Sequence, residues 1–128
     1  MRLNRIHHAA IICSDYQRSR QFYVEVLGLR VIAENYRTER HSYKLNLALP
    51  DGSQIELFSF PGSPERLTRP EACGLRHLAF EVENIAAWKV KLESIGIAVE
   101  EIRTDEYTNQ CFVFFPDPDG FPLELYEA

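Results

Sequence analysis

The first half of the chain changes between strand-like and helix-like spacing of its apolar residues. Residues 5–14 are short, apolar and rich in isoleucine, which favours a strand buried on both faces. Over about 15–27 the spacing becomes helical. Phe22, Tyr23, Val26 and Leu27 fall at i, i+1, i+4 and i+5 of this stretch. Ser14 or Asp15 can cap this helix and Gly28 can end it, so the pattern predicts one helix from Asp15 to Leu27.

Three further strand-like stretches complete the first half, at about 29–36, 42–49 and 54–60. The last two flank Pro50-Asp51-Gly52, which is typical of a hairpin turn. The predicted order is therefore β-α-β-β-β. Residues 61–74 contain three prolines, two glycines and no apolar period, which indicates an exposed linker.

The second half repeats this order. Residues 75–82 are strand-like, and a helix follows that Gly96 ends. Ile85, Trp88, Leu92 and Ile95 fall at i, i+3, i+7 and i+10 of this helix. Three more strands are predicted at about 97–104, 110–115 and 121–126.

Equivalent residues in the two halves keep a nearly constant separation. His8 and His77 lie 69 residues apart, and three other pairs lie 68 apart. Those pairs are Gly28 with Gly96, Gly52 with Gly120, and Glu56 with Glu124. We therefore predict an α+β fold with two βαβββ modules in tandem, at about 4–60 and 75–128, within a single domain of residues 1–128.

Composition and charge narrow the classes of function. With 128 residues, of which 45% are hydrophobic, the chain can bury a core. A net charge of −5 with no run of Lys or Arg argues against nucleic-acid and membrane partners, so a small molecule is expected. The N-terminal apolar stretch is too short for a signal peptide or a membrane span, which indicates a cytoplasmic protein. The three scattered cysteines, Cys13, Cys73 and Cys111, fit reduced thiols.

Two glutamates stand out because each lies inside an apolar strand. Glu124 is flanked by Leu123 and Leu125, where an unpaired carboxylate would be costly unless it has a partner or a metal ion. Glu56 holds the equivalent place in the first half. Strand geometry turns each glutamate away from its apolar neighbours and puts His77 opposite the apolar face of its own strand.

If the helices cover the apolar faces, four residues look into one concavity: His8, Glu56, His77 and Glu124. Imidazole and carboxylate ligands suit a divalent ion such as Zn²⁺, Ni²⁺, Co²⁺, Mn²⁺ or Fe²⁺. Taken singly, each histidine is more simply a core or edge residue and Glu56 an edge-strand charge; the matched set of four favours a metal site. His7 is left out because a regular strand points it away from His8, and His41 lies in a polar loop.

Several motifs resemble those of the glyoxalase I and bleomycin-resistance superfamily, also called vicinal oxygen chelate proteins. They are HAAIICSD at 8–15, FY at 22–23 before LGL at 27–29, GLRHLAF at 74–80, and DPDG at 117–120 leading to Glu124. The resemblance implies mixed sheets curled around a metal cavity, with His8, Glu56, His77 and Glu124 as ligands. It also implies a homodimer, with the cavity built from modules of one chain or of two.

The complete His, Glu, His, Glu set resembles the glyoxalase I pattern. It implies a lactoylglutathione lyase-like metalloenzyme that shuttles a proton on a small carbonyl or hemithioacetal substrate, with Zn, Ni or Co preferred and Mn or Fe as other candidates. Glu124 is the first choice for the general base and Glu56 the second. The alternatives are an Fe(II)-dependent dioxygenase and a non-catalytic small-molecule binding or resistance protein. Arg37, Arg40 and Lys44 are candidates for holding an anionic group, although a solvated loop is the simpler interpretation.

Overall fold

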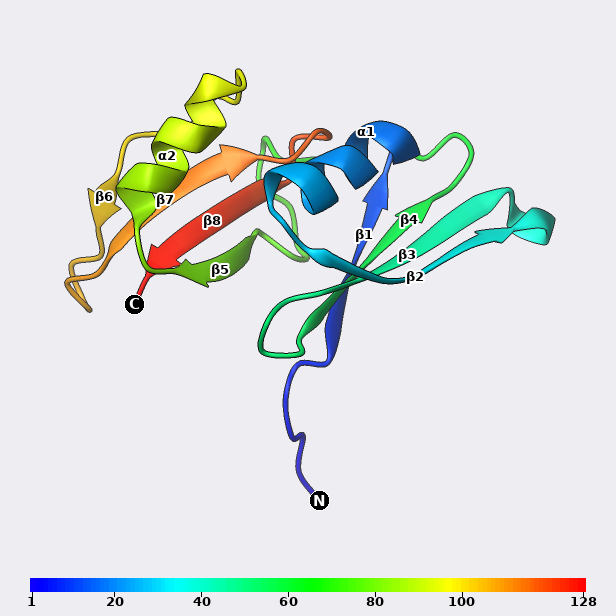
Figure 1. Cartoon of the computed structure of the whole chain (residues 1–128), viewed down its shortest axis with the longest axis horizontal. Helices are drawn as coiled ribbons and strands as arrows, with labels where there is room; N and C mark the ends of the chain where they lie inside the picture. The colour runs from blue at the N-terminus through cyan, green and yellow to red at the C-terminus, as the bar shows by residue number, and fades with distance from the viewer. The chain divides into compact units, whose positions relative to one another are not determined.

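The computed structural model describes residues 1–128, which divide into two units, Met1–Glu65 and Arg66–Ala128 (Figure 1). Each unit joins a four-stranded mixed sheet to an α-helix, so the predicted α+β class is confirmed. We expected the sheets to curl around a metal cavity. Each sheet is instead open, because its two outer strands do not pair with each other.

The first unit follows the predicted β-α-β-β-β order. Its strands are β1 (His8–Cys13), β2 (Arg30–Arg37), β3 (Ser42–Ala48) and β4 (Gln54–Ser59). They lie in the order β1-β4-β3-β2, with β1 parallel to β4 and the other pairs antiparallel. A short 3₁₀ helix, η2 (Thr38–Arg40), joins β2 to β3. The sheet therefore places β1 and β4, the strands that carry His8 and Glu56, side by side.

The helix of the first unit has two parts where the sequence predicted one. α1 (Tyr16–Gln21) continues into a π-helical turn, η1 (Phe22–Val26). The Asp15 carboxylate caps α1 by accepting a hydrogen bond from the Arg18 backbone N–H at 3.2 Å. Gly28 follows the helical segment with a φ of +77°, a left-handed conformation that glycine adopts without steric cost.

The second unit contains β5 (Leu78–Val82), β6 (Arg103–Thr104), β7 (Cys111–Pro116) and β8 (Pro122–Glu127) in the order β5-β8-β7-β6. Here β5 is parallel to β8. The helix α2 (Ile85–Ser94) contacts β7 and β8 and lies across one face of this sheet (Figure 1). The Asn84 side chain caps α2, and the Glu127 carboxylate accepts a second hydrogen bond, from the Ile85 N–H at 3.0 Å.

Two predicted strands of the second unit are shorter in the structure. Of 97–104, only Arg103–Thr104 forms a strand, and Glu100 joins β7 through a single backbone hydrogen bond to the Phe114 carbonyl. The strand predicted at 75–82 begins at Leu78 because the carbonyls of Leu75 and Arg76 accept hydrogen bonds from the Arg66 side chain. His77 therefore lies immediately before β5, not inside a strand.

Each sheet buries one face in an apolar core. In the first unit Leu45, Leu47 and Leu57 are 0% exposed, and in the second unit Leu92 of α2 packs in a core with Val113 and Leu123, all 0% exposed. Because strand residues alternate between faces, the neighbours of these leucines lie on the opposite, open face. A bilayer-crossing helix would need more length and more apolar surface than any helix here provides.

Candidate metal site

The first unit brings His8 and Glu56 together on the open face of its sheet. The parallel pairing of β1 and β4 places Ala10 opposite Glu56, and His8 shares the face of Ala10 because it lies two positions earlier. His8 Nε2 is 3.5 Å from Glu56 Oε1. The Glu56 side chain is 13% exposed and that of His8 is 41% exposed. This half of the predicted ligand set is therefore assembled within one sheet.

The other carboxylate oxygen of Glu56 is held separately. In the antiparallel register of β3 and β4, Asn46 lies opposite Glu56. The Asn46 amide donates a hydrogen bond to Glu56 Oε2 at 3.2 Å, and the Lys44 ammonium lies 3.9 Å from the same oxygen. These contacts fix the carboxylate and leave Oε1 facing His8.

The second unit contains an equivalent histidine–glutamate pair, but different residues surround its glutamate. His77 Nε2 is 2.9 Å from Glu124 Oε2, and their side chains are 27% and 11% exposed. Phe114 lies opposite Glu124 in the β7–β8 register, where the first unit has Asn46. The His77 ring packs edge-on against the Phe114 ring at a centroid distance of 5.0 Å. Glu124 therefore has one polar side-chain contact, His77, whereas Glu56 has three.

The donor atoms of each pair have a separation that suits a shared divalent ion. Bonds of about 2.0–2.2 Å to nitrogen and oxygen place adjacent ligand atoms about 3 Å apart. The observed 3.5 and 2.9 Å lie near this value. Neither unit by itself brings three or more His, Cys, Asp or Glu side chains together. The donors of each unit therefore fit a borderline divalent metal, and each unit by itself supplies two of the four predicted ligands.

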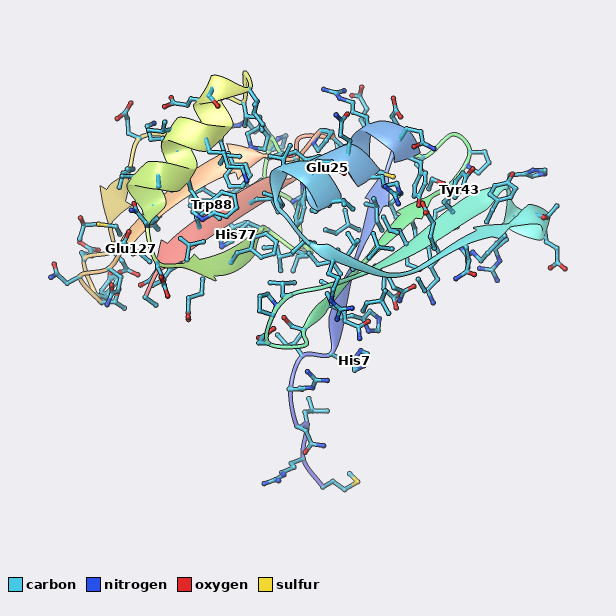
Figure 2. The ribbon with its side chains drawn as sticks, viewed as in Figure 1. His7, Glu25, Tyr43, His77, Trp88 and Glu127 are labelled. Carbon is cyan, nitrogen blue, oxygen red and sulfur yellow. The ribbon has the colours of Figure 1, made fainter.

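The side chain of His7 does not point away from His8 as the sequence predicted. Strand alternation does not apply to His7, because β1 begins at His8. The two Nδ1 atoms lie 3.0 Å apart, and the rings meet edge to face at 5.2 Å; Figure 2 shows His7 at the start of β1. With Nδ1 of His8 in contact with His7, its Nε2 is the nitrogen that faces Glu56. His7 is thus a contact that orients the His8 ring.

Two of the three cations proposed from the sequence to hold an anionic group have other contacts. The Arg37 guanidinium lies over the Phe58 ring at 5.1 Å and donates to the Ser42 hydroxyl, while Lys44 faces Glu56. Arg40 is exposed in η2.

A cavity lined by arginines occurs instead in the second unit, where it includes His77, and the sequence interpretation missed it. Three of these arginines are Arg66, Arg69 and Arg76, within or just beyond the segment predicted to be a linker. Their clustering within 11 residues was a signal in the sequence.

Comparison with known proteins relates the whole chain to one group. Residues 5–125 match the family model described as Glyoxalase/Bleomycin resistance protein/Dioxygenase superfamily. The chain is 59% identical over 127 residues to the uncharacterized protein YwkD of Bacillus subtilis, a match covering 99% of each chain. It is 30% identical over 131 residues to the lactoylglutathione lyase of Salmonella typhimurium, covering 97% of this chain and 93% of that protein. The crystal structure of the glyoxalase family protein from Enterococcus faecalis superposes with a TM-score of 0.88 at 47% identity, covering 96% of this chain and 97% of that one.

Proposed function

The chain belongs to the Glyoxalase/Bleomycin resistance protein/Dioxygenase superfamily, and on that basis we propose that it is a metal-dependent, glyoxalase I-like lyase or isomerase. The superfamily includes enzymes such as lactoylglutathione lyase and generally uses divalent metals. The proposed substrate is a small carbonyl compound or a hemithioacetal. One observation carries the proposal: in each unit the Nε2 atom of a histidine lies within 3.5 Å of a glutamate oxygen on the open face of the sheet.

The proposed ligands are His8, Glu56, His77 and Glu124, and the proposed ion is Zn²⁺, Ni²⁺ or Co²⁺, with Mn²⁺ and Fe²⁺ as other candidates. Both pairs are needed, either from the two units of one chain or from two chains of a homodimer. When bound, the ion supplies a Lewis acid that polarises the carbonyl oxygen of the substrate.

Glu124 is the proposed general base. Its carboxylate can move toward a substrate by giving up one polar contact, His77, whereas Glu56 would have to leave Asn46 and Lys44 as well. Glu124 takes a proton from the carbon beside the carbonyl group and returns it to the neighbouring carbon. Glu56 remains in place as the fixed carboxylate of the set.

The test is turnover of the methylglyoxal–glutathione hemithioacetal by protein stripped with a chelator and reloaded with Ni²⁺ or Zn²⁺. Loss of the proton-transferring carboxylate should lower kcat about 10²- to 10⁴-fold in Glu124→Gln. The matched control is Glu81→Gln, since Glu81 is exposed on β5 and shares the face of Glu124. Its kcat should equal that of the wild type. An unchanged kcat in Glu124→Gln at saturating metal would remove the base assignment.

Two other results would replace the proposed activity. Oxygen consumption with a catechol and Fe²⁺, without hemithioacetal turnover, would assign the protein to the dioxygenases of the superfamily. Less than about 0.1 equivalent of metal after growth in metal-rich medium, a level far below a resident ion, would assign it to non-catalytic small-molecule binding.

A further inference from the structure

The second unit contains a cavity of about 280 Å³ beside one of the proposed metal ligands. His77 and Phe114 form part of its wall, and the segment that opens the unit forms another part. The volume lies just below the usual range of about 300–1,000 Å³ for ligand-binding pockets, which favours a small metabolite over a large one. A molecule held there would touch His77 directly.

The wall of this cavity is positively charged, although the chain as a whole is acidic. It contains four guanidinium groups and two carboxylates, so its formal charge is +2. The arginines are Arg66, Arg69, Arg76 and Arg103, and the carboxylates are Glu71 and Glu100. The whole chain has a net charge of −5. A local positive charge on an acidic protein favours one compact anion over an extended polyanion.

Two of the guanidinium groups are fixed in place before any ligand binds. Arg66 donates hydrogen bonds to the carbonyls of Leu75 and Arg76 at 2.9 and 3.1 Å, and it lies over the Phe121 ring. Arg103 lies over the rings of Phe112 and Phe114 at 4.9 and 5.6 Å. Arg66 also donates from Nε to the Thr68 hydroxyl at 3.1 Å, so its Nη1 group is left to bind a ligand. Stacked guanidinium groups keep a defined plane, which suits recognition of carboxylate or phosphate oxygens.

The remaining charges are arranged so that an anion can enter. Arg76 pairs with Glu71 and Arg103 pairs with Glu100, and all four side chains are more than half exposed. Arg76 holds the pKa of the Glu71 carboxyl below its usual range, so Glu71 is an ionised internal counterion at neutral pH. Exposed pairs of this kind contribute little stability and exchange readily for another anion. Arg69 has no carboxylate within ion-pair distance and is exposed.

We propose that this cavity is the substrate subsite for a small organic dianion, either a dicarboxylate or a phosphate ester, whose reactive end reaches His77. The inference rests on the proposed function, because it places the substrate's anionic part beside one of the proposed metal ligands. The formal charge of +2 on the cavity wall matches a ligand with two negative charges. The fixed guanidinium planes of Arg66 and Arg103 match the planar carboxylate group or the phosphate group of such a ligand.

The test is calorimetric titration of chelator-treated protein with inorganic phosphate, malonate and acetate at constant ionic strength. Phosphate or malonate should bind with a Kd of about 1 mM or tighter, and acetate at least tenfold more weakly. Tighter binding of phosphate indicates a phosphate ester, and tighter binding of malonate indicates a dicarboxylate. Amide resonances of residues 66–76 and 100–103 should shift on binding in nuclear magnetic resonance spectra.

Variants separate this cavity from general charge attraction. Arg69→Gln should weaken dianion binding about five- to tenfold, and Arg69→Lys, which keeps the charge, should weaken it less. The matched control is Arg30→Gln, an exposed arginine at the start of β2 in the other unit, which should bind as the wild type does. Both variants at Arg69 should fold, because its side chain makes no hydrogen bond or ion pair, and circular dichroism checks this.

The inference is overturned if no dianion binds at 20 mM, which is about 20 times the expected Kd. It is also overturned if acetate binds as tightly as malonate. A third contradicting result is that Arg30→Gln weakens dianion binding as much as Arg69→Gln does. The titration needs neither metal nor turnover. Dianion binding without any turnover would therefore overturn the proposed function alone. Hemithioacetal turnover without dianion binding would overturn this inference alone.

Discussion

The proposed contribution of Glu124 to metal binding can be measured through stability, apart from its proposed role as general base. Glu124→Gln keeps the size of the side chain and removes the charge. The carboxylate is 11% exposed and lies 2.9 Å from His77, so the substitution changes one of the two donors in the second unit. A ligand that binds only the folded protein stabilises it by about 2.7 kcal/mol at 100 times its Kd.

That free energy converts into a temperature shift through the length of the chain. An unfolding entropy of about 2.1 cal/mol/K per residue gives about 0.27 kcal/mol/K for 128 residues. Metal at 100 times its Kd should therefore raise the midpoint of thermal unfolding by about 10 °C. If loss of the carboxylate weakens affinity about 100-fold, the same metal concentration equals the new Kd. The stabilisation then falls to about 0.4 kcal/mol and the shift to about 1.5 °C.

The assay is circular dichroism melting of three proteins, each with chelator and then with Ni²⁺: the wild type, Glu124→Gln and the control Glu81→Gln. The control should keep the full shift, since Glu81 is exposed and has no contact with His77. Equal metal-induced shifts in the wild type and in Glu124→Gln would refute the assignment of Glu124 as a ligand. A lost shift in both variants would show that general negative charge on this face attracts the ion.

Two further predictions concern stability. Arg20 and the Tyr16 hydroxyl donate hydrogen bonds to the Glu34 carboxylate, and these bonds hold its pKa below the ordinary 4.5. A carboxyl whose pKa is lower in the folded state stabilises the protein at pH values above its unfolded-state pKa. That stabilisation is lost as the pH falls through the folded-state pKa. Glu34→Gln should therefore cost about 1 kcal/mol at pH 7 and less below pH 4.5 in urea titrations, and a cost independent of pH would contradict this. Leu92→Ala should lower the free energy of unfolding by about 3 kcal/mol in the same assay, because Leu92 is 0% exposed. The control Val90→Ala should change it by less than about 0.5 kcal/mol, because Val90 is 69% exposed on the same helix. Equal costs would show that α2 is not packed through Leu92.

The parts of the fold that the sequence predicted are those with strong local patterns. Alternation around Ile55 and Leu57 indicated which face of β4 is buried, and both residues are at most 2% exposed. The same alternation indicated that Glu56 faces the other way, toward His8. The cap of the first helix was predicted as Ser14 or Asp15, and in the structure it is Asp15.

The errors arose where long-range contacts decide the local structure. Strand β5 begins at Leu78 and not at Leu75, because the Arg66 side chain donates hydrogen bonds to the backbone carbonyls of Leu75 and Arg76. No periodicity in residues 75–82 could show this. The arginine cavity was missed for the same reason: Arg103 and Arg69 come together only when β6 lies beside the segment that the sequence presented as a linker.

The difference between Asn46 and Phe114 was visible in the sequence but had no meaning until the strand register was known. The two residues stand 68 positions apart, like Glu56 and Glu124, and each lies opposite its glutamate. Only this pairing shows that one carboxylate is held by an amide and the other lies beside an aromatic ring.

This unequal pair has a consequence for stereochemistry. Two identical halves would offer a substrate two equivalent carboxylates, and proton transfer could then occur from either face of the reacting carbon. Asn46 and Lys44 restrain the Glu56 carboxylate, whereas Glu124 has a single polar contact, His77. Under the proposed function, the proton leaves and returns on one face only, so a prochiral substrate gives a single enantiomer. Divergence of the repeat at two positions, Asn46 with Phe114 and Lys44 with Phe112, thus makes the two carboxylates unequal as bases.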